Sequence, residues 1–265
     1  MSEDVGSVRK RSETFGNVRK RSETLGRDRK MEKRYLKEKA GILIPNKNGC
    51  TNFGAVALNG KKLYCLKTAQ SNTASTLYTY QDFRTGASFK TRKYTNQMGH
   101  GNGMAYWDGK IYIAPLDNYV QILDEKNGMK RTKLPAPINV SSIAHYKDDL
   151  FLAGLSLVRI TDSEVKLVKR FKLVWDDPDF PIGQDIGFHK DCLYIIRSSS
   201  GKNSNVILRC PFDRKEKTLV PDLIYLSEER KGLYEFESID FYGEKMVIGA
   251  NVLGDKDGIY TATVK

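Results

Sequence analysis

Residues 99–115, GHGNGMAYWDGKIYIAP, combine closely spaced glycines with two side chains that could bind a ligand, His100 and Asn102. A glycine-rich loop binds a dinucleotide when the spacing is G-x-G-x-x-G between a strand and a helix. Here the spacing is G-x-G-x-G, and alternating apolar residues follow around an Asp108-Gly109 turn, which is typical of a β-hairpin. The stretch therefore predicts a loop that presents His100 and Asn102 at the start of a hairpin, and not a nucleotide site.

Polar residues also precede four other hairpins of the same kind. The five hairpins predict a ring-shaped fold, as argued below. We predict that these polar residues gather at one mouth of the central channel of the ring and bind a small polar molecule, a sugar or a peptide. The alternative is that they only hydrogen-bond neighbouring loop backbone. The predicted ligand-binding residues are Asn52, His100, Asn102, Gln184, Asp185, Glu235 and Glu237.

The acidic members of this group allow two further interpretations. Oxygen atoms of Asp185, Glu235 and Glu237 could hold Ca²⁺, which takes six to eight oxygen ligands. Alternatively, Glu237 and Asp185 could act as acid and base in a hydrolase or lyase of glycosidase type, with His100 carrying a proton. The sequence has no G-x-S-x-G motif and no paired His or Cys at zinc spacing. Binding without catalysis is our first hypothesis.

The hairpin pattern occurs five times in the sequence, and the copies align without a gap. They are VALNGKKLY from Val56, MAYWDGKIY from Met104, IAHYKDDLF from Ile143, IGFHKDCLY from Ile186 and IDFYGEKMV from Ile239. Each copy is followed by a further stretch rich in β-branched and aromatic residues. Repeats of this length and composition predict an all-β, five-bladed β-propeller of four-stranded antiparallel blades.

The last copy ends after three strands, so its outer strand must come from elsewhere if the ring is to close. Residues 41–45, GILIP, precede the first blade, and we predict that they supply this strand. The predicted domains are therefore a tail, residues 1–40, and a propeller, residues 41–265.

The tail contains 13 Lys and Arg against 7 Asp and Glu, so it carries half of the net charge of +12. It repeats a ten-residue unit as SVRKRSETFG and NVRKRSETLG and has few apolar residues, which predicts disorder over residues 1 to about 30. Residues 31–41 could form a short helix. Residues 1–30 could bind a polyanion through their charge, or a modifying enzyme could recognise the repeated peptide.

No apolar run approaches the roughly 18 residues of a membrane span, and no secretory signal is evident. We expect a cytoplasmic, monomeric protein. Four cysteines, Cys50, Cys65, Cys192 and Cys210, show no C-x-x-C spacing and are expected to be structural or free thiols.

The runs NGCTNFGAVALNGKKLYCL, MGHGNGMAYWDGKIYIAP, GQDIGF and YEFESIDFYGEKMVIGAN resemble uncharacterised bacterial β-propeller proteins that carry G-H-x-N-x-M before an inner hairpin. The resemblance covers residues 48–265. It implies a five-bladed propeller with a polar channel mouth, and it implies no particular reaction. Gly103 departs from the pattern, because this group often has Asp there.

Overall fold

The computed structural model describes residues 31–136, 138, 140–161 and 163–264. The chain divides into two compact units, Met1–Glu32 and Lys33–Lys265. The predicted disordered segment and its ten-residue repeats, residues 1–30, lie outside the described residues. The fold described below is that of the second unit.

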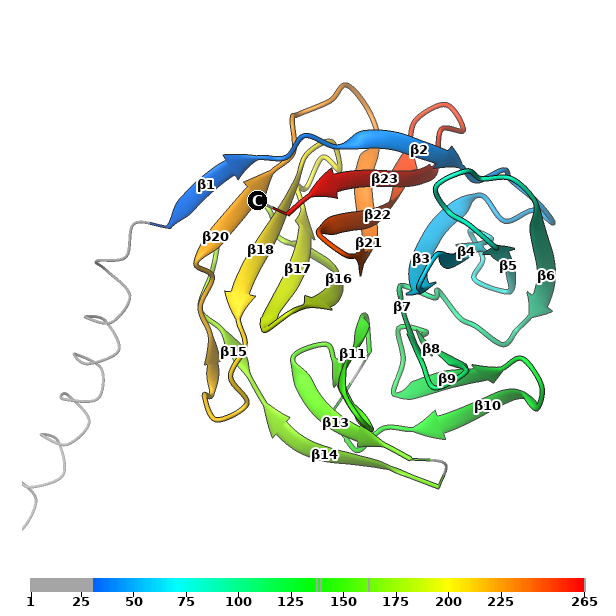
Figure 1. The fold of residues 1–265 in the computed structure, drawn as a ribbon, viewed down its shortest axis with the longest axis horizontal. Coiled ribbons are helices and arrows are strands. Elements are labelled where there is room, and N and C mark those ends of the chain that lie inside the picture. The colour runs from blue at the N-terminus through cyan, green and yellow to red at the C-terminus, as the bar shows by residue number, and fades with distance from the viewer. Residues whose placement is uncertain (1–30, 137, 139, 162, 265) are drawn as a thin grey trace, which may run out of the picture. The chain divides into compact units, whose positions relative to one another are not determined.

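The second unit is the predicted five-bladed propeller, with four antiparallel strands in each blade (Figure 1). Blade 1 consists of β3 (Asn52–Asn59), β4 (Lys62–Thr68), β5 (Ala74–Tyr80) and β6 (Phe89–Thr95); blade 2 of β7 (Gly103–Trp107), β8 (Lys110–Ala114), β9 (Tyr119–Asp124) and β10 (Gly128–Lys133); blade 3 of β11 (Ile143–Lys147), β12 (Leu150–Ala153), β13 (Ser156–Ile160) and β14 (Val165–Arg170). Blade 4 consists of β16 (Ile182–His189), β17 (Cys192–Ser198), β18 (Asn205–Pro211) and β20 (Leu223–Leu226); blade 5 of β21 (Tyr234–Tyr242), β22 (Lys245–Val252), β23 (Gly258–Thr263) and β2 (Lys39–Leu43). A short parallel pair, β15 (Lys172–Leu173) with β19 (Thr218–Leu219), joins the segment before blade 4 to the connection between β18 and β20.

The first strand of each repeated hairpin is the inner strand of its blade. The five inner strands, β3, β7, β11, β16 and β21, contact one another in a closed ring around the central channel (Figure 1). They are buried on both faces because each blade packs between two others, whereas the outer strand β6 is mostly exposed. Small residues let neighbouring inner strands approach closely. A Cβ atom on Gly187, for example, would lie 2.9 Å from the carbonyl oxygen of Ile239.

The predicted closing strand is confirmed. β2 pairs antiparallel with β23, with Lys39 opposite Thr261 and Leu43 opposite Gly258, so the strand begins two residues before the GILIP segment. The chain just before it forms β1 (Glu32–Tyr35), which extends the sheet of blade 4 beside β20. The short helix considered for residues 31–41 is therefore wrong. The unpaired edges of two blades provide hydrogen-bond partners that override the helix preference of a Lys- and Glu-rich segment.

A buried lysine fastens the closing segment to blade 1. Lys67 on β4 is fully buried, and its Nζ lies 2.8 Å from a carboxylate oxygen of Asp257. The same Nζ donates to the carbonyl oxygen of Ile44 at 3.3 Å and to the side chain of Asn46. One cation thus links blade 1, the hairpin of blade 5 and the chain that follows β2.

The four cysteines are free, and Cys50, Cys65 and Cys210 are buried. Within the described residues, no helix has the length and apolar character needed to cross a membrane.

Candidate functional site

Every inner strand pairs with one neighbouring strand in its own sheet. Its other edge faces the channel, and the backbone N–H and C=O groups on that edge have no strand to pair with. Polar side chains of the preceding blade satisfy several of these groups. Ser238 Oγ accepts the N–H of Val56 at 2.9 Å, and Asp185 Oδ2 lies 3.4 Å from the backbone nitrogen of Ile239. Polar residues in the channel therefore help to join the blades, whatever else they do.

Four of the predicted ligand residues lie together at the start of the inner strands, and we call them the mouth set: Asn102, Gln184, Glu235 and Glu237. Asn102 Nδ2 donates to Gln184 Oε1 at 3.4 Å, and Gln184 Nε2 donates to Glu235 Oε1 at 2.6 Å. The second oxygen of Glu235 lies 3.1 Å from Nζ of Lys202, whose side chain is half exposed. Blades 2, 4 and 5 are thus linked by one chain of hydrogen bonds.

Glu237 and Glu235 form a pair of neighbouring carboxyl groups. Burial raises the pKa of Glu237 well above the usual value, and the neighbouring Glu235 carboxylate raises it further. Asn251 Nδ2 donates to Glu237 Oε1 at 2.6 Å, which opposes the rise without cancelling it. The pair therefore combines a Glu237 with a raised pKa and a Glu235 that forms an ion pair with Lys202.

His100 and Asn52 lie outside this hydrogen-bonded set. Nδ1 of His100 is 3.0 Å from Oδ1 of Asn72, and burial lowers the pKa of the imidazole, with Lys202 lowering it further. The ring is thus neutral at neutral pH. Asn52 is the first residue of β3 and lies opposite Thr68 in the sheet.

Asp185 lies deeper in the channel and is fully buried. Its Oδ2 accepts the hydroxyl of Ser238 at 2.6 Å, and its Oδ1 has no hydrogen-bond partner in the described part of the chain. Burial raises the pKa of this carboxyl group well above the usual value. A Cβ atom on Gly103 would lie 2.5 Å from Oδ1, so residue 103 must be glycine for the Asp185 carboxyl to fit.

A calcium site does not emerge from these carboxylates. Among the described residues, no group of three or more His, Cys, Asp or Glu side chains is arranged to hold a metal ion. Each carboxyl group instead has other partners. Asp185 contacts Ser238, Glu235 contacts Gln184 and Lys202, and Glu237 contacts Asn251.

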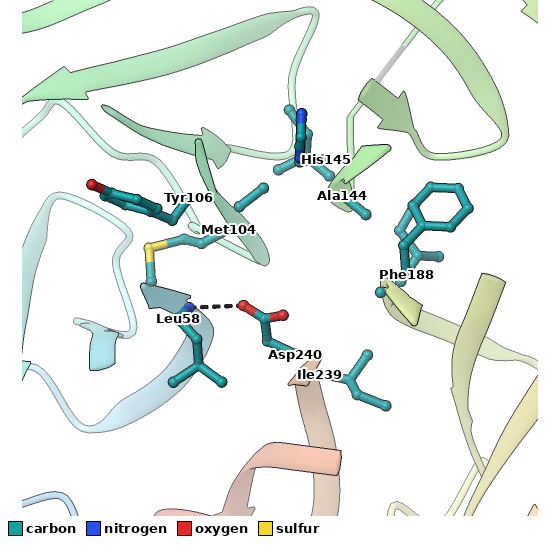
Figure 2. Close-up of a pocket in the computed structure, with 12 residues that line it drawn as sticks. Leu58, Met104, Tyr106, Ala144, His145, Phe188, Ile239 and Asp240 are labelled. Atoms are coloured by element: carbon teal, nitrogen blue, oxygen red, sulfur yellow. Dashed lines mark hydrogen bonds between the residues drawn. The ribbon is translucent and has the colours of Figure 1, made fainter. Parts of the chain in front are cut away.

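Sequence reasoning missed Lys202, Asn251 and Asp240. Asp240 lines a cavity of about 180 Å³ in the channel, where its carboxylate accepts the N–H of Leu58 at 2.7 Å (Figure 2). A signal for it was present, because the second residue of the five aligned hairpins is Ala, Ala, Ala, Gly and then Asp240. Lys202 and Asn251 lie outside the aligned hairpin residues, so the hairpin alignment alone does not single them out.

No protein-family model and no curated protein matches the sequence. Among solved structures, a glutaminyl cyclase from Myxococcus xanthus is similar with a TM-score of 0.55 and 9% sequence identity, covering 89% of this chain and 100% of that one. A beta-xylosidase, RS223, is similar with a TM-score of 0.50 and 9% identity, covering 86% of this chain and 94% of that one. At this level of identity the likeness supports the five-bladed propeller fold alone.

Proposed function

We propose that the chain is a non-enzymatic binding propeller and that the mouth set captures a small polar ligand or the end of a peptide. The observation that carries this proposal is the hydrogen-bonded chain from Asn102 through Gln184 to Glu235. Burying amide and carboxylate groups is costly, and apolar side chains of similar size would often stabilise a fold as well or better. A binding role accounts for polar residues from three blades meeting at this point.

The composition of the mouth set indicates the chemistry of the ligand. Its two carboxyl groups and two amides are rich in acceptor oxygens, and its exposed neighbour Lys202 adds one cation at the rim. A ligand that offers several O–H or N–H groups, such as a sugar or a peptide terminus, would satisfy these oxygens.

The test is a thermal-shift screen of the full chain against sugars, short peptides and divalent cations, followed by calorimetry with the best ligand. We expect at least one sugar or peptide to raise the melting temperature, and Glu237→Gln to weaken its binding about tenfold or more. Glu244→Gln, at an exposed carboxylate of the same hairpin, is the matched control and should bind normally. A screen without any shift, or equal binding by E237Q, would contradict the proposal.

The second candidate is acid–base catalysis, and the raised pKa of Glu237 beside the Glu235 carboxyl group favours it. Two neighbouring carboxyl groups held in different protonation states are the usual arrangement for an acid and a base. The contacts of Asp185 with the next blade favour Glu235 as the partner of Glu237, with His100 as the proton carrier. Hydrolysis of chromogenic glycosides that falls more than about a hundredfold in E237Q would support catalysis. Turnover that E237Q leaves unchanged would count against it.

A further inference from the structure

The channel contains a cavity beyond the mouth set, near the turns of the inner hairpins, which we call the turn-end cavity (Figure 2). The residues that line it lie a few positions further along the same inner strands, roughly 10 Å from the mouth set at about 3.3 Å per residue. Its volume is about 180 Å³. An apolar cavity of about 150 Å³ accommodates benzene, so this space suits a molecule of about six heavy atoms.

Asp240 provides the charge of this cavity. Its two carboxylate oxygens accept the backbone N–H groups of Leu58 and Phe241, each at 2.7 Å, which fixes the orientation of the group. Figure 2 shows the carboxylate among the other labelled side chains of the lining. Burial raises the pKa of Asp240 to about 6, and no cation lowers it in the described part of the chain. Above that pH the channel therefore holds an ionised carboxylate without a counter-ion.

Three aromatic side chains, Tyr106, His145 and Phe188, occupy equivalent positions on blades 2, 3 and 4 and line the same cavity. A ring of the preceding blade supports each of them. The ring-centre distances are 5.6 Å for Tyr106 with Tyr64, 5.2 Å for His145 with Trp107 and 5.0 Å for Phe188 with Tyr146. These contacts fix the aromatic lining before any ligand binds.

His145 does not supply the missing positive charge. Burial lowers the pKa of its imidazole, and Nε2 lies 2.9 Å from the carbonyl oxygen of Asp148, so the neutral ring donates that hydrogen bond. Burial also raises the pKa of Asp185, a carboxyl group of blade 4, well above its usual value, and a carboxyl group supplies no positive charge in either protonation state.

We propose that the turn-end cavity binds a small organic ammonium ion, with Asp240 as its counter-ion and Tyr106, His145 and Phe188 as its aromatic walls. Aromatic rings attract ammonium groups, and a partly buried carboxylate without a cation gains from a paired charge. A metal ion fits less well, because Asp240 is the one carboxylate among the lining residues and its oxygens already accept hydrogen bonds. The proposal is independent of the function proposed for the mouth set, since the two sites share no residue.

The test uses the amide resonances of Leu58 and Phe241 as reporters, because both N–H groups donate to Asp240. The full chain is titrated with tetramethylammonium chloride, with tert-butanol as a neutral probe of similar size and with sodium acetate as an anion. We expect tetramethylammonium alone to shift both resonances, with a dissociation constant of about 1 mM. No shift, or an equal shift with tert-butanol or acetate, would overturn the proposal.

Variants then assign the binding to the cavity. Asp240→Asn should weaken tetramethylammonium binding at least about tenfold. Tyr106→Leu keeps the Asp240 carboxylate and its hydrogen bonds and should weaken tetramethylammonium binding several-fold. This variant replaces D240N in the test if D240N does not fold.

The control E244Q removes an exposed charge from the same hairpin and should bind normally. E237Q should also bind normally, which separates this site from the mouth set. Wild-type affinity in both D240N and Y106L would overturn the assignment.

Discussion

The carboxyl groups of Asp185 and Asp240 lie where the other blades have small residues, and each reaches across to the inner strand of the next blade. The contacts of Asp240 with the N–H of Leu58 and of Asp185 with the N–H of Ile239 join neighbouring blades. The burial of each carboxyl group opposes its ionisation. Asp240 could have been found from the sequence, because it interrupts an otherwise small-residue position of the repeat. The contacts of Glu235 with Lys202 and of Glu237 with Asn251 could not, since they depend on side-chain positions in loops and on neighbouring strands.

The titration of Asp240 predicts a dependence of stability on pH. Its pKa rises from 3.8 to about 6 on folding, so the folded state holds the proton more tightly than the unfolded state. The resulting stability is present below about pH 4 and is lost as the pH rises through about 6. Asn does not titrate, so D240N lacks this loss of stability. The free energy of unfolding of D240N minus that of wild type should therefore increase by about 1–3 kcal/mol from pH 4 to pH 7.

Urea unfolding of wild type and D240N at several pH values measures this difference. The control E244Q should not gain stability in the same way, because Lys190 holds the pKa of the exposed Glu244 below its usual value. A difference between D240N and wild type that stays constant over this range would contradict the assignment of the shift to Asp240.

At the level of elements, the hairpins and the closing strand could be predicted because the pattern repeats five times and leaves one outer strand missing. β1 could not, because its sequence favours a helix locally and forms a strand only beside the free edge of β20. Leu36, which follows β1, donates its N–H to the carbonyl oxygen of Leu226 at 2.7 Å and packs in the core of blades 4 and 5. Tertiary contacts of this kind override local preference and are invisible in a single segment.

Two lysines on β4 provide a comparison of a buried and an exposed ion pair on one strand. Lys67→Met should destabilise the fold by about 3–5 kcal/mol, because it leaves the buried carboxylate of Asp257 without its cation. Lys62→Met should cost no more than about 1 kcal/mol, since Lys62 pairs with the exposed Glu125. Chemical denaturation of both variants measures the two costs. Equal destabilisation by the two changes would show that Lys67 does not fasten the ring.

At the level of the whole propeller, the first described strands join the last two blades. β2 completes blade 5, Lys67 holds the segment after β2, and the side chain of Glu38 accepts hydrogen bonds from Arg230 and from Tyr234, the latter at 2.6 Å. A propeller whose last blade lacks its outer strand exposes the edge of β23 to solvent and to other chains. The short segment between β1 and Asn46 should therefore contribute more to stability than its length suggests.

A series of truncations tests this closure. Deletion of residues 1–30 should leave the melting temperature nearly unchanged, because β1 and β2 remain. Deletion of residues 1–37 removes β1 but keeps Glu38 and the whole of β2, and we expect a moderate loss of about 1–2 kcal/mol. Deletion of residues 1–45 also removes β2 and the carbonyl group of Ile44 that binds Lys67, and it should destabilise the fold by several kcal/mol and promote association through β23. Calorimetry and size-exclusion chromatography measure both effects, and equal melting temperatures for the first and last truncations would refute closure by β2.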